Sequence, residues 1–440
     1  MSTQGEQGPP FGTVLVTGAS GFVGFHVVEA LLQQNVAGVV RCLTRRPTPE
    51  LEQLQRSWGE ARVQLCVGDL LGPPSALAPL LSGCGGLVHC AAHYRWWTRE
   101  PGLFAALNVD ATVALMRLAA EAGVRQPGLF AALNVDATVA LMRLAAEAGV
   151  RQVVHVSTVL AAGCPPGWGS AERPLTPHAP PGPTASRYAA SKAAADAAVL
   201  AMAAEAGTGT GTEEGVEVEE AVAEGGAMAA GAAAAAAAAA PQEGARPGAR
   251  RRGRGRRRLR ACVVCLACVV GPDRRLVGGG EEDVLRIADL VRGKVPASLG
   301  HDTTFTYIGV RDAAAALVAA LLRGQPGRRY LVGNQRLTTG EYFDLIARLS
   351  GTPPPPRRVP LWLAAAWARA AAGWAALTGI PPQAPPDLIR TVAYGTLLFD
   401  SSSSEAELRL DVPYRSIEEA FREAVLTVQE HDEGRGTSPP

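Results

Sequence analysis

Short runs of almost uninterrupted apolar residues alternate with helix-like stretches along the first 270 residues. Such runs are typical of parallel strands covered on both faces, because every side chain of such a strand is buried. The alternation of strand and helix predicts a doubly wound α/β sheet. The predicted strands are 14–17, 39–44, 63–67, 87–90, 153–156 and 261–270, and the predicted helices include 26–34, 107–122 and 189–205.

From about residue 275 the pattern changes to shorter mixed elements joined by proline-rich links. We therefore expect a parallel-sheet domain made of 13–206 and 259–274, followed by a smaller α/β substrate-binding lobe at 275–430. The two ends of the chain, 1–12 and 431–440, are predicted to be flexible or disordered.

The most apolar stretch of that lobe, 361–377, carries Trp362, Trp367 and Trp374 and is interrupted by Arg369. It is short for a membrane span, so we expect no segment that crosses a membrane. We expect instead an amphipathic helix packed on its own lobe, with contact to a membrane surface as the alternative.

A segment of 26 residues, PGLFAALNVDATVALMRLAAEAGVRQ, occurs twice in tandem, at 101–126 and 127–152, without a difference. Structural repeats usually need three or more units and diverge in sequence. This isolated duplication therefore does not predict a solenoid.

Residues 207–258 are of low complexity, with glutamates, an alanine tract and an arginine-rich end. Little apolar surface beyond alanine is available there to offset the entropy of ordering, so we expect a disordered insertion. The arginine run is read as a solvated loop, with contact to nucleic acid as the weaker alternative.

The formal net charge of the chain is +1, which gives no reason to expect a specific nucleic-acid partner. Cys262, Cys265 and Cys268 are three residues apart, and in a strand this spacing sends successive side chains to opposite faces, so we expect no metal site. Reduced thiols and an N-terminus without a secretory signal predict a cytoplasmic protein.

The sequence TGASGFVG lies between the first predicted strand and the first predicted helix. Gly18 permits a tight turn, Gly21 lets the main chain approach a pyrophosphate, and Gly24 lets helix and strand pack closely. The helix N-terminus also offers free N–H groups to the phosphates. The residues expected to contact a dinucleotide here are Gly18, Ser20, Gly21, Phe22 and Gly24.

The end of the second strand distinguishes the two nicotinamide cofactors. NAD-binding proteins place a carboxylate there for the ribose 2′-hydroxyl, whereas this chain has Arg45 and Arg46. Arginine favours a 2′-phosphate through charge-assisted hydrogen bonds. We therefore expect NADP(H), with NAD(H) as the alternative, and we expect Asp69 and Leu70 to bind the adenine.

Tyr188 and Lys192 lie four residues apart at the start of a predicted helix, and hence on one face of it. A neighbouring ammonium lowers the pKa of a phenol, which suits tyrosine to exchange a proton with a carbonyl or alcohol oxygen. Ser157 and Thr158 end the preceding strand, where a hydroxyl can bind the same oxygen. This order of groups predicts an acid–base site.

TGASGFVG, GDL, LVHCAAHY, HVSTV and YAASK, in that order, resemble the extended short-chain dehydrogenase/reductases, the NAD-dependent epimerase/dehydratase superfamily. Within it the chain is most similar to dihydroflavonol 4-reductase-like proteins and hopanoid-associated sugar epimerases. The resemblance implies a Rossmann-type domain, with Thr158 as the substrate hydroxyl, Tyr188 as the acid–base and Lys192 as its partner and a cofactor contact. It also implies cofactor contacts at Ala91, Ala92, Val270, Gly271 and Pro272, and a substrate pocket that includes 93–97.

The family has one helix between the fourth and fifth strands, with an Asn-Val pair near its start. Asn108-Val109 and Asn134-Val135 both fit this pattern, but only one copy can occupy the groove beside the sheet. We expect the first copy, 101–126, to pack there and the second to bulge at the sheet edge away from the cofactor.

The sequence thus predicts an NADP(H)-dependent oxidoreductase that moves hydride between the nicotinamide and a CH–OH/C=O group of a bulky small molecule. One alternative is an NAD-dependent nucleotide-sugar epimerase or dehydratase. The other is a cofactor-binding scaffold without catalysis. A homodimer is the assembly considered.

Overall fold

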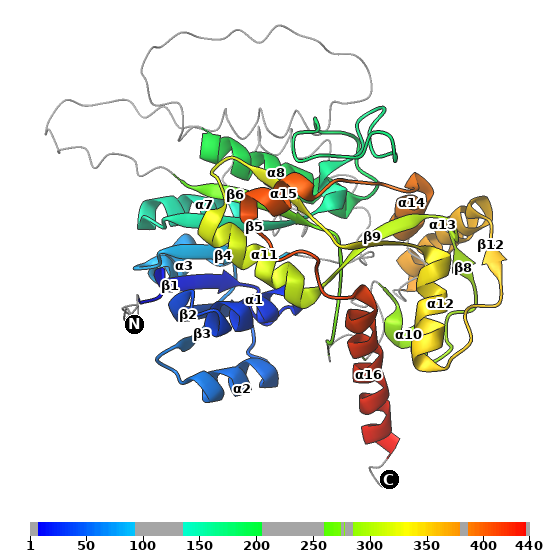
Figure 1. Cartoon of the computed structure of the whole chain (residues 1–440), viewed down its shortest axis with the longest axis horizontal. Helices are drawn as coiled ribbons and strands as arrows, with labels where there is room; N and C mark the ends of the chain where they lie inside the picture. The colour runs from blue at the N-terminus through cyan, green and yellow to red at the C-terminus, as the bar shows by residue number, and fades with distance from the viewer. Residues whose placement is uncertain are drawn as a thin grey trace, which may run out of the picture.

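A computed structural model (Figure 1) describes residues 8–92, 135–204, 259–273, 277, 285–378 and 386–436. Seven of the described strands form one sheet, and all neighbours in it run parallel. In spatial order they are β10 (Arg329–Val332), β6 (Ala261–Leu266), β5 (Gln152–Thr158), β4 (Gly86–His89), β1 (Phe11–Thr17), β2 (Ala37–Thr44) and β3 (Val63–Val67). The predicted doubly wound α/β sheet is confirmed.

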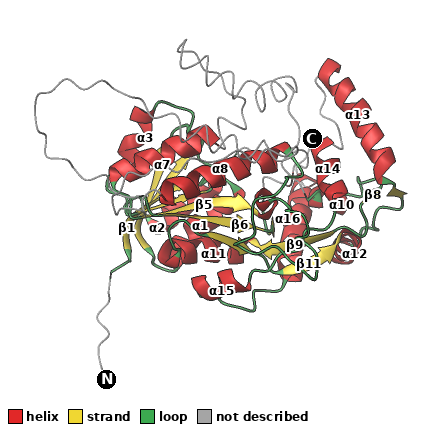
Figure 2. Ribbon diagram, turned by 90° about the horizontal axis from the view of Figure 1, so that it is seen from above, coloured by secondary structure: helices red, strands yellow, loops and turns green. Residues whose placement is uncertain are grey.

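Helices cover both faces of this sheet, which explains the apolar strands. In Figure 2 α3, α7 and α8 lie on one side of the strands and α1 and α11 on the other. Every residue of β4 and of β6 is buried between these two layers. The helices of this domain are α1 (Phe22–Gln33), α2 (Pro49–Trp58), α3 (Pro74–Leu81), α7 (Ala137–Ala148), α8 (Arg187–Ala204), α11 (Val310–Arg323) and α15 (Ser402–Leu408), with a 3₁₀ turn at Val159–Ala162.

The order of the strands reverses at β1, because the chain passes from β1 to β2 on one side and places β4 on the other. In doubly wound sheets the carboxyl ends of the strands at such a reversal border the ligand crevice. The glycine-rich turn follows β1 directly, and hence lies at this crevice.

The second lobe has its own core around Tyr307, Tyr342 and Phe421. Its three-stranded sheet consists of β11 (Gln335–Thr338), β9 (Thr304–Gly309) and β7 (Cys268–Val270), and β12 (Arg358–Val359) pairs with β8 (Ser298–Leu299). Its helices are α10 (Ile287–Val291), α12 (Thr339–Ser350), α13 (Leu361–Thr378), α14 (Pro386–Tyr394) and α16 (Ile417–Gly436).

The domain boundaries differ from those predicted. The single strand predicted at 261–270 is interrupted at Ala267, and its two parts, β6 and β7, belong to different sheets. Parts of 275–430 belong to the large domain, because α11 packs on α1 and β10 pairs with β6. The other parts of this stretch form the second lobe. At the end of the chain α16 continues to Gly436, inside the segment predicted as a disordered tail.

Helix α13 packs on α14 of its own lobe, but only along one side. Trp362 is 72% exposed and Trp367 67% exposed, while Ala368 on the opposite side is buried. None of the helices in the described residues is long and apolar enough to cross a membrane.

The helix that fills the groove between β4 and β5 comes from the second copy of the duplicated segment, which corrects the expectation for the first copy. Leu141 and Met142 of α7 are fully buried, and α7 packs against α3 and α8. The reason is connectivity. Gly149 ends α7 in the left-handed conformation, and β5 begins at Gln152, so only the second copy reaches β5 by the short connection usual for αβ units.

Removing either copy by deletion produces the same amino-acid sequence, so a point substitution is needed to identify the copy that packs on the sheet. We expect Leu141→Ala to lower the free energy of unfolding by about 2–5 kcal/mol, because it opens a cavity in the core. The matched change in the first copy, Leu115→Ala, leaves this packing intact and is expected to change stability by less than about 0.5 kcal/mol.

Chemical denaturation of both variants and of the double variant measures this difference. If Leu141→Ala were silent and only the double variant unstable, either copy would be able to fill the groove. The assignment to the second copy would then be wrong.

Candidate active site

The turn between β1 and α1 is built on glycines that approach one another too closely for side chains. Gly18 has a φ of 65°, and a Cβ there would lie 2.8 Å from the main chain of Ala91. A Cβ on Gly24 would lie 2.1 Å from the Gly18 oxygen, and one on Gly21 would lie 2.9 Å from the same atom. These contacts bring the first turn of α1 against the ends of β1 and β4.

The N-terminus of α1 is open to an anion. Its N-cap residue is Gly21, which supplies no side-chain hydrogen bond, and the first turn carries no acidic side chain. Free N–H groups and the positive end of the helix dipole therefore lie at the switch point of the sheet, where a pyrophosphate is bound in this fold. The residues present fit a dinucleotide.

The end of β2 lies beside this turn. The Ser20 hydroxyl is 2.7 Å from Thr44 Oγ1, and Arg45 and Arg46, which follow Thr44, are exposed. Neither arginine is paired with an acidic side chain in the described part of the chain. Two cationic groups are thus available where a ribose 2′-substituent would lie.

The remaining residues predicted to contact the cofactor differ in their surroundings. Asp69 is exposed and accepts a hydrogen bond from Leu71 N at 3.0 Å, with Leu70 half-buried beside it. Ala91 and Ala92 follow β4 beside Gly18. The Val270 side chain is only 1% exposed and packs in the core of the second lobe. A Cβ on the next residue, Gly271, would lie 3.6 Å from Phe22 of the glycine turn. The predicted pocket residues 93–97 lie outside the described residues.

The predicted acid–base residues come from the end of β5 and the first turns of α8. Lys192, 2% exposed, donates a hydrogen bond from Nζ to Val156 O at 2.8 Å. Tyr188 precedes Lys192 by one turn of α8 and is half-buried, and Thr158 is half-buried at the end of β5. The Ser157 hydroxyl points away from them and donates to Asp196 Oδ2 at 2.7 Å. The Thr158 oxygen accepts a hydrogen bond from Leu160 N at 3.4 Å, which leaves its hydroxyl hydrogen to be donated to a ligand.

Lys192 also contacts a row of buried polar side chains, which the sequence did not lead us to expect. His155 Nε2 lies 3.3 Å from both Lys192 Nζ and Asp196 Oδ1. The ring of His155 stacks on that of His89 at 5.3 Å. His89 in turn contacts Thr17 Oγ1 at 2.6 Å and, at 2.9 Å, Thr138 Oγ1 of α7. The four-residue spacing of Tyr188, Lys192 and Asp196 along one helix face was the available signal.

Burial and the Asp196 charge shift the pKa of Lys192 in opposite directions and that of Tyr188 in the same direction. Burial lowers the pKa of Lys192, and the Asp196 carboxylate partly restores it. Burial, followed by the same carboxylate, raises the pKa of Tyr188. The expected lowering of the phenol pKa by Lys192 does not offset this rise, because desolvation disfavours the phenolate. The arrangement holds a neutral phenol, which is a proton donor, at neutral pH.

The three cysteines considered for a metal have different surroundings. Cys262 lies against Gly324, Cys265 lies near Asp196, and Cys268 belongs to β7 of the other sheet. Burial raises the pKa of Cys262 to about 12 and that of Cys268 to about 11. These thiols remain protonated at neutral pH, whereas metal coordination requires the thiolate.

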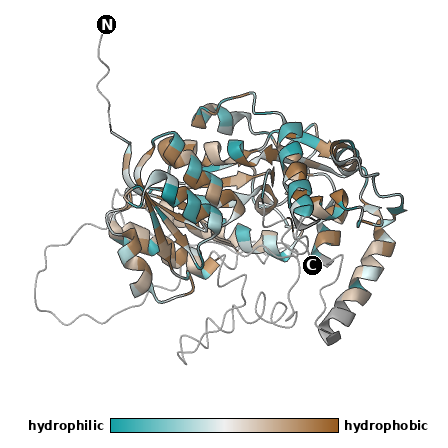
Figure 3. Cartoon of the chain, turned by 90° about the horizontal axis from the view of Figure 1, so that it is seen from below, coloured by the Kyte–Doolittle hydropathy of each residue, from teal (hydrophilic) through white to brown (hydrophobic). Residues whose placement is uncertain are grey.

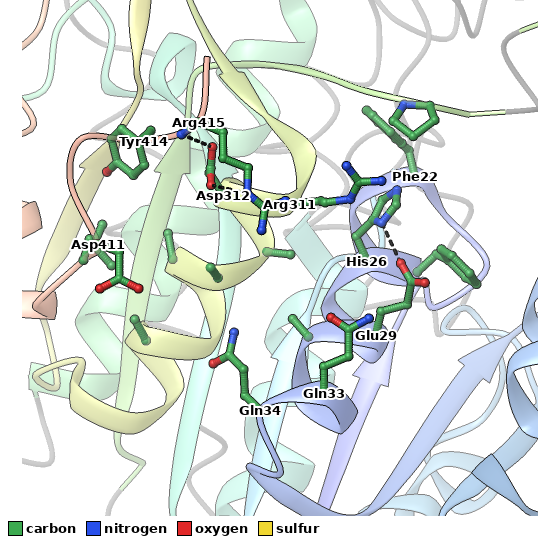
Figure 4. Close-up of a pocket in the computed structure, with 18 of the residues that line it drawn as sticks. Phe22, His26, Glu29, Gln33, Gln34, Arg311, Asp312, Asp411, Tyr414 and Arg415 are labelled. Atoms are coloured by element: carbon green, nitrogen blue, oxygen red, sulfur yellow. Dashed lines mark hydrogen bonds and ion pairs between the residues drawn. The ribbon is translucent and has the colours of Figure 1, made fainter. Parts of the chain in front are cut away.

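A groove of about 800 Å³ lies between α1, α11 and the chain that follows α15 (Figure 4). It reaches the glycine turn at Ser20 and Phe22, but none of Thr158, Tyr188 and Lys192 lines it. On its walls His26 Nδ1 lies 2.8 Å from Glu29 Oε2, and Arg415 forms an ion pair with Asp312. The groove is therefore separate from the acid–base groups.

The sequence matches the profile of the NAD dependent epimerase/dehydratase family at residues 14–126 and 121–211. A protein of Synechocystis that bears the provisional name dihydroflavonol 4-reductase is 26% identical over 94% of both chains. The ceramide reductase of Caulobacter vibrioides is 35% identical over 26% of this chain and 33% of its own length.

Solved structures agree on the fold. DesIV, a dTDP-glucose 4,6-dehydratase from Streptomyces venezuelae solved with NAD and TYD bound, aligns over 96% of this chain and 98% of its own. The TM-score is 0.60 and the identity 19%. A structural likeness at this identity concerns the arrangement of the chain alone.

The buried histidines make stability depend on pH. Burial, and then the nearby Lys192, lower the pKa of His155 to about 4, against about 6.5 in an unfolded chain. Between these values the unfolded state binds a proton that the folded state does not, so stability is lost as the pH falls. We expect the loss between pH 7.5 and 5.5 to be about 1 kcal/mol smaller in His155→Asn than in the unsubstituted chain.

Urea denaturation at the two pH values measures this slope. The control is His178→Asn, which removes an exposed histidine from a loop and is expected to keep the slope of the original chain. Equal slopes in His155→Asn and the original chain would show that His155 is already charged in the fold.

Proposed function

Because the chain belongs to the NAD-dependent epimerase/dehydratase family, we propose that it is an NADP(H)-dependent reductase. The reaction moves hydride between the nicotinamide and a CH–OH/C=O group of a bulky substrate. The observation that carries the proposal is the position of Lys192, which follows Tyr188 by one helical turn and donates a hydrogen bond to Val156 O of the strand that ends in Thr158. These are the groups that proton exchange at a carbonyl oxygen requires.

The chain's own residues account for binding. The glycine turn and the N-terminus of α1 hold the phosphates, and Arg45 with Arg46 neutralise a 2′-phosphate on the adenosine ribose. NADP(H), when bound, supplies the hydride. The absence of a carboxylate at the end of β2 supports NADP(H) over NAD(H).

The acid–base groups act on the substrate oxygen. Thr158 donates a hydrogen bond to the carbonyl oxygen and orients it. Tyr188, kept neutral by its surroundings, gives that oxygen its proton as negative charge develops. Lys192 stabilises the phenolate that remains, and Asp196 keeps Lys192 charged in a site where burial favours the neutral amine.

The names of two relatives support reduction of a large substrate. One is named for dihydroflavonol 4-reductase and the other for ceramide reductase. A nucleotide-sugar epimerase would use the same tyrosine and lysine. The experiment below therefore distinguishes a reductase from an epimerase.

We expect Tyr188→Phe to lower kcat for NADPH-dependent reduction by about 10²–10⁴-fold, because the proton donor is lost while the cofactor contacts remain. A panel of bulky aromatic and long-chain ketones, followed by the absorbance of reduced nicotinamide, measures the rate. The matched control is Tyr330→Phe, because Tyr330 belongs to β10 at the edge of the sheet and its hydroxyl accepts a hydrogen bond from Gln325 N. This variant is expected to retain the rate.

Two results would contradict the proposal. Equal rates in Tyr188→Phe and the original chain would remove the role of the phenol. A purified protein that carries tightly bound NAD⁺, reduces no ketone with NADPH and interconverts sugar nucleotides would be an epimerase.

A further inference from the structure

Helix α13 has an apolar face that no other element of the described residues covers. Trp362, Leu363, Ala366, Trp367 and Ala370 are all exposed, and at 3.6 residues per turn they lie on one side of the helix. Ala368, on the opposite side, is 1% exposed and faces the lobe, where α13 packs on α14. Figure 2 shows α13 extending away from the body of the chain. In Figure 3 the described part of this helix is coloured mostly pale, between white and light brown.

Such a face is unusual on a soluble domain. Scattered apolar residues are normal on protein surfaces, but contiguous exposed patches mark sites of interaction. Two tryptophans on one helix face add a chemical preference. The indole ring, with an apolar body and an N–H group, favours the boundary between water and lipid.

The charge around this face is of one sign. Residues 345–386 contain four arginines and no aspartate, glutamate or lysine. Arg357 and Arg358 are exposed directly before α13, and Arg369 is exposed on the helix itself. None of these three is in an ion pair in the part of the chain that the structure describes. The free cations complement an anionic partner.

We propose that α13 docks on an anionic lipid surface, with Trp362 and Trp367 inserted at the headgroup boundary and Arg357 and Arg358 on the lipid phosphates. An amphipathic helix with an aromatic apolar face and a basic rim binds membranes in this manner. The helix lies along the surface, because no helix in the described residues is long and apolar enough to cross a membrane.

A second copy of the chain fits this face less well. A two-fold contact through α13 brings the same surface of both copies together. Two acid-free, arginine-bearing segments would then meet without a compensating charge. Lipid headgroups supply that charge.

Co-sedimentation of the full chain with vesicles tests the proposal. We expect binding to equimolar phosphatidylcholine and phosphatidylglycerol, with a blue shift of tryptophan fluorescence, and much weaker binding to phosphatidylcholine alone. Trp362→Ser with Trp367→Ser is expected to lower the bound fraction several-fold at any salt concentration. Arg357→Gln with Arg358→Gln is expected to lower it at low salt, where headgroup attraction is strongest.

Leu426→Ser is the matched control, because Leu426 of α16 is 47% exposed, as Leu363 is at 46%, but lies on another element. It is expected to bind as the original chain does, and thermal unfolding confirms that each variant is folded. Absence of vesicle binding, or equal binding by the tryptophan variant, would overturn the proposal. A dimer in sedimentation analysis that the tryptophan variant converts to monomer, with no lipid binding, would assign the face to a second copy.

Discussion

The close approach of α1 to the end of β1 is the constraint on which the candidate site depends. A single carbon atom on Gly24 would lie 2.1 Å from the Gly18 oxygen, a separation that no side chain tolerates. Without that carbon, the open N-terminus of α1 lies at the point where the strand order reverses. Through this one contact, the turn and the helix N-terminus would hold a dinucleotide along the carboxyl edge of the sheet.

The predicted acid–base residues at the end of β5 depend on ionisable side chains that are buried in the core. Lys192, His155 and Asp196 are almost completely buried, and burial alone favours the neutral form of each. They remain close because the strands place His155 beside His89 and because α8 repeats a polar residue every four positions. Thr138 of α7 completes the row, so the copy of the duplicated segment that packs on the sheet also contributes to the surroundings of the site.

Much of this arrangement was predictable from local sequence. Parallel strands covered on both faces are apolar at every position, so β1 to β6 were recognised, and the glycine turn and the Tyr188–Lys192 pair follow from short-range spacing. The predictions that failed concern contacts between distant segments. Nothing near β10 indicates that it pairs with β6, and identical copies cannot reveal which of them packs on the sheet. The interruption at Ala267 is equally invisible, since the apolar run continues through it.

The buried partners of Lys192 could have been found by asking why His89 and His155 lie within otherwise apolar strands. The exposure of α13 could not have been predicted, because the same apolar residues form the helix whether or not its own lobe covers it.

Calorimetric titration of the purified chain with NADPH and with NADH tests the central claim most directly. The site described above predicts saturable binding of one dinucleotide per chain, tighter for NADPH, and a smaller difference between the two in Arg45→Glu. Heat changes no greater than those of dilution for both cofactors, in a sample that unfolds cooperatively and holds no nicotinamide from purification, would contradict it.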